Sequence, residues 1–103
     1  MKKTTLILLL TVSILSCVKP ATARFELSAT DYVVGEDISY FNKSTNVKSQ
    51  HWNFGDGQFS EEHSPVHKYA KAGTYRVVLT LNGGSSEMST DVTILDENSA
   101  ESK

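Results

Sequence analysis

From residue 24 onward, the chain alternates apolar and polar residues with a period of two. This alternation is typical of a β-strand with one buried face, especially where β-branched and aromatic residues occupy the apolar positions. Five runs show it, and their predicted inward residues are Phe25 and Leu27; Ile38 and Tyr40; Trp52 and Phe54; Tyr75, Val77, Leu79 and Leu81; Met88, Thr90, Val92 and Ile94. No stretch after residue 23 sustains a helical period, so we predict an all-β fold.

Turn-forming residues separate these runs, including Gly35, the Gly55-Asp56-Gly57 triplet and the Gly83-Gly84 pair. Short strands at this spacing indicate an antiparallel β-sandwich. Trp52 lies mid-chain, where an immunoglobulin-like sandwich has its buried tryptophan. Tyr75 precedes Val77 by two residues, the spacing of a tyrosine corner, and Val77 stands where an antibody domain has its second cysteine. We therefore predict an immunoglobulin-like sandwich without a disulfide.

The N-terminus has the pattern of an export signal. Lys2 and Lys3 precede an apolar run over residues 6–15, which is too short to span a bilayer core of roughly 30 Å but suits a signal peptide. Residues 14–17, Ile-Leu-Ser-Cys, resemble a bacterial lipobox, and Cys17 is the single cysteine of the chain. We predict a signal peptide over 1–16, lipidation at Cys17 and a lipidated tether over 17–24, anchored in the cell envelope.

Two features of this segment refine that prediction. The residue after the cysteine, Val18, is not aspartate, which favours the outer membrane by resemblance to known lipoproteins. Ala21-Thr22-Ala23 offers an alternative cleavage site, which would release a secreted or periplasmic protein beginning at Arg24.

Charge limits the partners of the domain. Without Lys2 and Lys3, eight Lys and Arg oppose twelve Asp and Glu, a net charge of −4. A mildly acidic domain lacks the basic footprint expected of a nucleic-acid-binding protein. We therefore expect no nucleic acid partner.

Several motifs together resemble the PKD (polycystic kidney disease) domain, over roughly residues 25–95. They are ISYFNKS, HWNFGDGQFS, SPVHKY and AGTYRVVLTL, with Trp52, Phe54, Gly55, Asp56, Gly57, His67, Tyr69, Gly73 and Tyr75 as the matching structural residues. Asn53 departs from the pattern, since the family usually has Asp there. The resemblance implies a seven-stranded β-sandwich over residues 25–96 that makes extracellular contacts and performs no catalysis itself.

Asp56 is the first candidate for chemistry, because it lies between two glycines after an aromatic strand. We interpret it as a turn residue, since Asp readily accepts backbone N–H bonds and Gly tolerates positive φ. Calcium binding or acid–base catalysis is the alternative, but a Ca²⁺ site requires six to eight oxygen ligands and no D-x-D-x-D-G spacing occurs.

A zinc site shared by His63 and His67 is also opposed by the sequence, because Pro65 between them opposes a helix that would align the two side chains. We expect no metal, no cofactor and no catalytic residue, and we expect His67 to form hydrogen bonds within the sandwich.

Three aromatic residues are candidates for a contact surface: Tyr32, Phe41 and Phe59. Phe41 alternates with the inward Tyr40, and the other two fall in predicted loops, although loop aromatics also fold back over the ends of a sandwich.

The sequence thus favours a non-catalytic envelope lipoprotein whose domain binds an envelope or surface protein. The alternative ligand is a cell-wall or extracellular polysaccharide. Residues 97–103 form a polar tail that we expect to be disordered.

Overall fold

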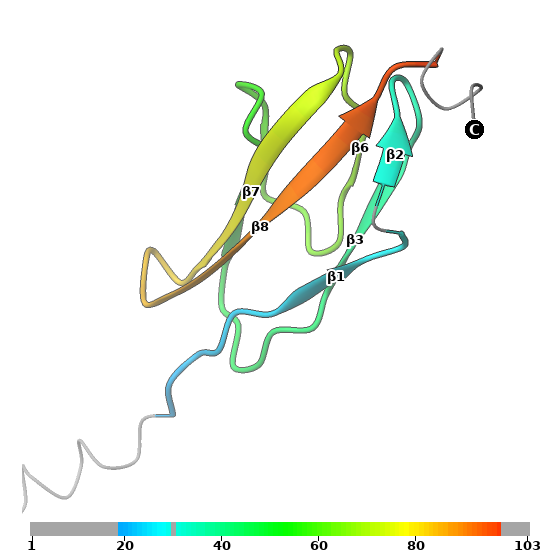
Figure 1. Cartoon of the computed structure of the whole chain (residues 1–103). Coiled ribbons are helices and arrows are strands. Elements are labelled where there is room, and N and C mark those ends of the chain that lie inside the picture. Colours follow the sequence, from blue (N-terminus) through cyan, green and yellow to red (C-terminus); the bar gives the residue numbers. More distant parts are fainter. Residues whose placement is uncertain (1–18, 30, 98–103) are drawn as a thin grey trace, which may run out of the picture.

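A computed structural model describes residues 19–29 and 31–97 of the chain (Figure 1). Eight strands occur in these residues: β1 (Phe25–Leu27), β2 (Asp31–Val33), β3 (Ile38–Asn42), β4 (Gln50–Asn53), β5 (Phe59–Ser60), β6 (Val66–His67), β7 (Gly73–Leu81) and β8 (Ser86–Leu95). The predicted signal peptide, Cys17 and residues 98–103 of the predicted tail lie outside the described residues. The part described contains no helix long and apolar enough to cross a membrane.

The strands form two sheets, which confirms the predicted sandwich. One sheet has the order β1-β3-β6, and the other has the order β2-β8-β7-β4-β5. All pairs are antiparallel except β2 with β8. The sandwich was expected to have seven strands and contains eight here, because β5 and β6 are separate pairings of two residues each.

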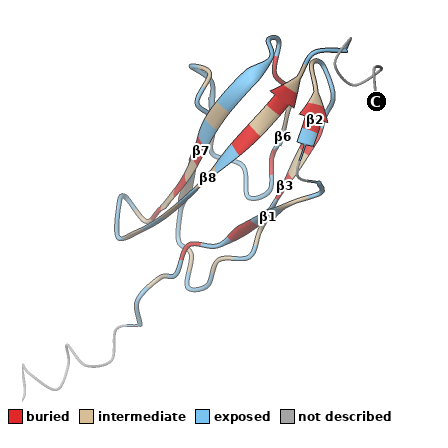
Figure 2. Cartoon of the chain, viewed as in Figure 1, coloured by how far each residue is buried: buried red, intermediate tan, exposed pale blue. Residues whose placement is uncertain are grey.

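The long β7–β8 hairpin is the centre of the larger sheet. Its register pairs Val77 with Thr90 and Leu79 with Met88, so the inward residues predicted from alternation face the same side. Figure 2 shows buried and less buried positions alternating along β8.

The core between the sheets is aromatic and aliphatic. Its fully buried side chains include Trp52, Tyr40, Tyr69, Phe54, Ile38, Leu79, Leu81, Ile94, Val77 and Val92. The ring of Trp52 contacts Phe25 edge-on, with centroids 5.1 Å apart, and lies 5.6 Å from the ring of Tyr40. Because a small domain buries a modest share of its surface, these aromatic rings supply much of its hydrophobic stabilisation.

The segment before β1 is part of the sandwich, which corrects the predicted tether. Thr22 and Thr45 exchange two backbone hydrogen bonds of 3.1 Å each. Ala23 is 8% exposed and belongs to the core. The expected tether over 17–24 is therefore docked chain from Pro20 onward, because backbone groups at 20–24 find partners that the sequence pattern does not reveal.

Candidate functional site

The turn after β4 carries the Gly-Asp-Gly triplet. Only glycine fits the backbone at the first residue of this triplet. Gly55 has φ +85°, and a Cβ atom built there would lie 2.6 Å from the carbonyl oxygen of Arg76. Gly57 also has positive φ, +91°, but has open space around it. The Asn53 Oδ1 atom accepts a 3.0 Å hydrogen bond from the Gly55 N–H, so an amide oxygen serves where the family's usual Asp would offer a carboxylate.

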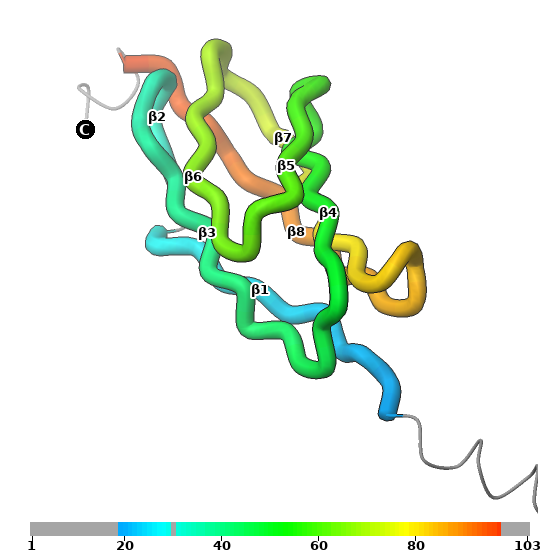
Figure 3. The backbone as a smooth tube through the Cα atoms, turned by 180° about the vertical axis from the view of Figure 1, so that it is seen from behind, coloured from blue at the N-terminus to red at the C-terminus, as the bar shows by residue number. Residues whose placement is uncertain are grey.

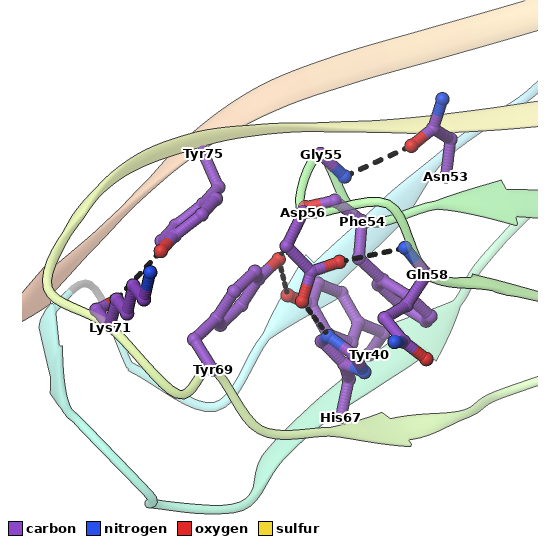
Figure 4. Close-up of polar contacts among 10 residues, drawn as sticks. All are labelled: Tyr40, Asn53, Phe54, Gly55, Asp56, Gln58, His67, Tyr69, Lys71 and Tyr75. Carbon is purple, nitrogen blue, oxygen red and sulfur yellow. Dashed lines mark hydrogen bonds and ion pairs between the residues drawn. The ribbon is translucent and has the colours of Figure 1, made fainter.

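Asp56 uses both carboxylate oxygens inside the protein. Its Oδ1 accepts a 3.1 Å hydrogen bond from the Gln58 N–H, and its Oδ2 lies 2.8 Å from His67 Nε2 (Figure 4). The two side chains are only 17% and 14% exposed. Since the turn follows β4 of one sheet and His67 lies in β6 of the other, this pair links the two sheets. We call it the Asp56–His67 clamp.

A column of aromatic rings continues from the clamp through the end of the sandwich. The His67 ring stacks on Phe54, with centroids 4.0 Å apart and planes 6° apart. Its edge meets Tyr69 at 4.8 Å, and Tyr69 stacks on Tyr75 at 4.2 Å. The column therefore packs the His67 ring tightly against Phe54 and Tyr69.

Two buried tyrosine hydroxyls complete the polar part of the cluster. The Tyr69 hydroxyl donates a 2.7 Å hydrogen bond to the Phe54 carbonyl. Because its one hydrogen is used there, the Tyr40 hydroxyl, 3.2 Å away, donates to the Tyr69 oxygen. Burial raises the pKa of Tyr40 to about 12. Burial also raises the pKa of Tyr69. Both phenols are therefore neutral structural groups at physiological pH.

The remaining motif residues have structural partners too. Trp52 is fully buried, and its indole N–H donates a 2.9 Å hydrogen bond to the Glu62 carbonyl. The Tyr75 hydroxyl donates a 2.7 Å hydrogen bond to the Lys71 carbonyl four residues upstream, as in a tyrosine corner. Gly73 begins β7 with φ +150°.

A shallow depression of about 370 Å³ opens beside the clamp. It is lined by Asp37, Asp56, Gln58, Val66, His67, Lys68 and Ala70. The Asp56 Oδ2 and His67 Nε2 atoms are directed at each other, and Asp56 Oδ1 accepts from the Gln58 N–H. Within residues 19–29 and 31–97, no three His, Cys, Asp or Glu side chains gather closely enough to hold a metal ion. His63 instead contacts the neighbouring Ser64 hydroxyl, 3.2 Å away.

The three candidate contact aromatics lie in different places. Phe41 is 44% exposed on β3, and Phe59 is 58% exposed on β5, so they lie on strands of different sheets. Tyr32, a candidate contact residue expected in a loop, lies in β2 and is 2% exposed. Its hydroxyl accepts a hydrogen bond from the Ala29 N–H and contacts the Ser28 hydroxyl, which explains how a tyrosine can be buried there. Tyr32 is therefore removed from the candidate contact surface.

Reasoning from the sequence did not identify an exposed valine that lies beside Phe41. Val66 is 59% exposed and pairs with Ser39 on β3, two residues before Phe41. Residues two apart on a strand share a face, so Phe41 and Val66 are diagonal neighbours on the outward face of the small sheet. Alternation with the inward-facing Pro65 and His67 could have predicted that Val66 points outward, but not that it lies next to Phe41. We call Phe41, Val66 and the intervening Ser39 the β3–β6 face; Figure 3 shows the two strands side by side.

Phe59 has a different neighbour. Its ring lies 5.4 Å from the His51 ring, at an angle of 31°. His51 in turn lies 3.6 Å from a Glu61 carboxylate oxygen, and both of these side chains are well exposed. This outward part of β4 and β5 thus carries a small aromatic platform edged by polar groups.

Comparison with known proteins agrees with this geometry. Residues 18–95 match the PKD domain family. The pre-pro-metalloprotease PrtV of Vibrio cholerae is 37% identical over 68 residues, which is 66% of this chain and 7% of the protease. The crystal structure of the PKD1 domain of that protease has a TM-score of 0.61 and 31% identity, covering 74% of this chain and 98% of that domain.

A further solved structure comes from work on the promiscuous specificity of carbohydrate-binding modules from the β-sandwich superfamily. It has a TM-score of 0.69 and 26% identity, covering 77% of this chain and 36% of that one. The family match takes in the clamp, the aromatic column and both sheets. This chain therefore belongs to the PKD domain family.

Proposed function

We propose that this protein is a non-catalytic lipoprotein of the bacterial cell envelope, whose PKD domain binds a partner protein through the β3–β6 face. The observation that carries the proposal is the exposure of Phe41 and Val66 side by side on one sheet face. An apolar pair beside a sheet edge is a feature of protein contact surfaces. β6 is the edge strand of the small sheet and is only two residues long, so the proposed contact uses its side chains rather than an added strand.

The anchoring part of the proposal rests on the lipobox-like residues that end at Cys17. A diacylglycerol on that cysteine, together with N-acylation, would anchor the chain stably to a membrane. Non-catalytic action is supported by the packing of the clamp, because the His67 ring is stacked on Phe54 and both clamp side chains are largely buried.

The test is site-specific photo-crosslinking in intact cells. A photoreactive amino acid at position 41 should give a discrete adduct with one envelope protein, and Val66→Asp should abolish it. The matched control carries the photoreactive residue at position 59, which lies on the other sheet. Equal adducts at positions 41 and 59 would contradict a specific protein contact on the β3–β6 face.

A polysaccharide is the second candidate ligand, favoured by Phe59. Its exposed ring beside His51 provides a flat surface of the kind that stacks on sugars, and a structural neighbour comes from work on carbohydrate-binding modules. Co-sedimentation with cell-wall sacculi tests this alternative. Binding that a soluble sugar competes, and that is lost in Phe59→Ala but kept in Phe41→Ala, would establish it in place of the protein contact.

A further inference from the structure

The docked segment before β1 makes contacts that cleavage at one of the two possible sites would remove and cleavage at the other would keep. The Pro20 carbonyl accepts a 2.8 Å hydrogen bond from the Asn46 side-chain amide. The backbone N–H of Ala23 donates a 3.0 Å hydrogen bond to the Ser86 hydroxyl, and Thr22 pairs with Thr45. Cleavage after Ala23 would remove all of these hydrogen bonds and a core side chain. Cleavage before Cys17 would keep them.

The same contacts fix which end of the sandwich lies nearest to an anchor at Cys17. From Cys17 to the docked Pro20 there are three residue steps, which span at most about 11 Å. The loops against which this segment docks run over residues 45–48 and 82–86, and together with residues 19–21 they line a surface hollow of about 740 Å³. We call these three segments the basal end. Figure 1 shows it opposite to the end where the described chain finishes.

Charge is distributed unevenly between the two ends. Lys19 and Lys48 line the basal hollow, which has no acidic residue in its lining. Arg24 and Lys43 follow in the adjacent paired segments, joined by a 2.8 Å backbone hydrogen bond. The depressions at the opposite end are lined by Asp37, Asp56, Asp96 and Glu97 against Lys68 and Lys71. The domain is acidic overall, yet the three segments of the basal end carry Lys19 and Lys48 and no acidic residue, with Glu87 following directly in β8.

From these contacts we infer that residues 20–24 are a docked stalk, which holds the basal end against the anionic phospholipid surface of the anchoring membrane. The mature chain then begins before Pro20. Basic side chains within a Debye length of anionic headgroups are attracted to them, and a linker of about 11 Å leaves little freedom to turn away. This inference rests on the proposed lipid anchor for its membrane, but its stalk depends only on the docked contacts. The domain then presents its acidic end, with the Asp56–His67 clamp, away from the membrane.

The first test is the N-terminus of the mature protein, read by mass spectrometry after expression of the full chain in a bacterial host. A peptide that begins at Cys17 and carries acyl chains is expected. A peptide that begins at Arg24 would overturn the inference. An N-terminus before Pro20 without acyl chains would support the stalk and contradict the proposed anchor, so the two failures are distinguishable.

The second test compares purified forms that begin at Val18 and at Arg24. The shorter form lacks four hydrogen bonds and the buried Ala23 side chain, and we expect its Tm to be lower by about 5–10 °C. Equal Tm values would show that the docked segment contributes nothing to the fold and would overturn the stalk.

The third test reads orientation. With Cys17 acylated, Ser85→Cys or Lys71→Cys introduces one free thiol, at the basal or the opposite end, and the first leaves both basal lysines in place. Each variant is labelled with a fluorophore and inserted into phosphatidylethanolamine–phosphatidylglycerol vesicles that contain headgroup-spin-labelled lipid. Stronger quenching at position 85 than at position 71 is expected, with a smaller difference in Lys19→Glu/Arg24→Glu. Equal quenching at both positions would overturn the orientation.

Discussion

Gly55 offers a sharp test of the motif turn, because a close neighbour provides its control. In Gly55→Ala, the new methyl group would lie 2.6 Å from the Arg76 carbonyl oxygen and 3.0 Å from the Arg76 nitrogen. Those atoms belong to the β7 backbone and cannot move aside as a flexible side chain would. The substitution also places a non-glycine residue at φ +85°, which costs about 1–2 kcal/mol. Adding the overpacking cost of about 1–3 kcal/mol gives a destabilisation of about 3 kcal/mol.

Gly57→Ala is the matched control, because its φ is similar and no atom lies within 4 Å of the place that its new methyl group would take. It should cost only the backbone strain, about 1 kcal/mol. Urea and thermal unfolding of both variants, made in the form that begins at Val18, measure the difference. At about 4–8 °C per kcal/mol for a domain of this size, Gly55→Ala should unfold about 10 °C below Gly57→Ala. Equal destabilisation would refute the close approach of the turn to β7.

The tyrosines and the clamp give further predictions. Tyr69→Phe leaves two buried polar groups without a partner, so it should lower the free energy of unfolding by about 3 kcal/mol. Tyr75→Phe removes a single hydrogen bond that is more exposed, and should lower it by about 1 kcal/mol. Urea unfolding measures both, and equal losses would contradict the assigned network. Because the raised pKa values of Tyr40 and Tyr69 favour the neutral forms in the folded state, their contribution to stability is complete below pH 10 and decreases above it, and that of Tyr40 is lost as pH rises toward about 12. The free energy of unfolding, measured from pH 9 to pH 11.5, should decrease above pH 10, and the decrease should be smaller in Tyr40→Phe. A flat profile would contradict the burial of the two tyrosines. A double-mutant cycle with Asp56→Asn and His67→Gln should give a coupling of about 1 kcal/mol, and a coupling near zero would contradict the clamp.

The fold could be predicted largely because its long strands carry a strong signal. β7 and β8 run for nine and ten residues, long enough for a period of two to stand out. The strands that were missed, β2, β5 and β6, have two or three residues, too few for a period of two to stand out without a longer alternating run around them. Tyr32 illustrates this: β2 pairs in parallel with β8, a non-local contact that no local pattern encodes.

The candidate site was predictable to a similar extent. A turn at Asp56 follows from its glycine neighbours, but the identity of its partner, His67, depends on how the two sheets face each other. The docking of Thr22 onto Thr45 also joins segments that are far apart in the sequence. The sequence pattern marked Phe41 as outward but could not place Val66 beside it, because that neighbour lies on another strand.

Photo-crosslinking at position 41 in intact cells tests the central proposal most directly. We expect one discrete protein adduct that depends on Val66 and is absent when the photoreactive residue stands at position 59. No adduct at position 41, together with sugar-competed binding to sacculi that requires Phe59, would contradict the protein-binding account and identify a polysaccharide ligand.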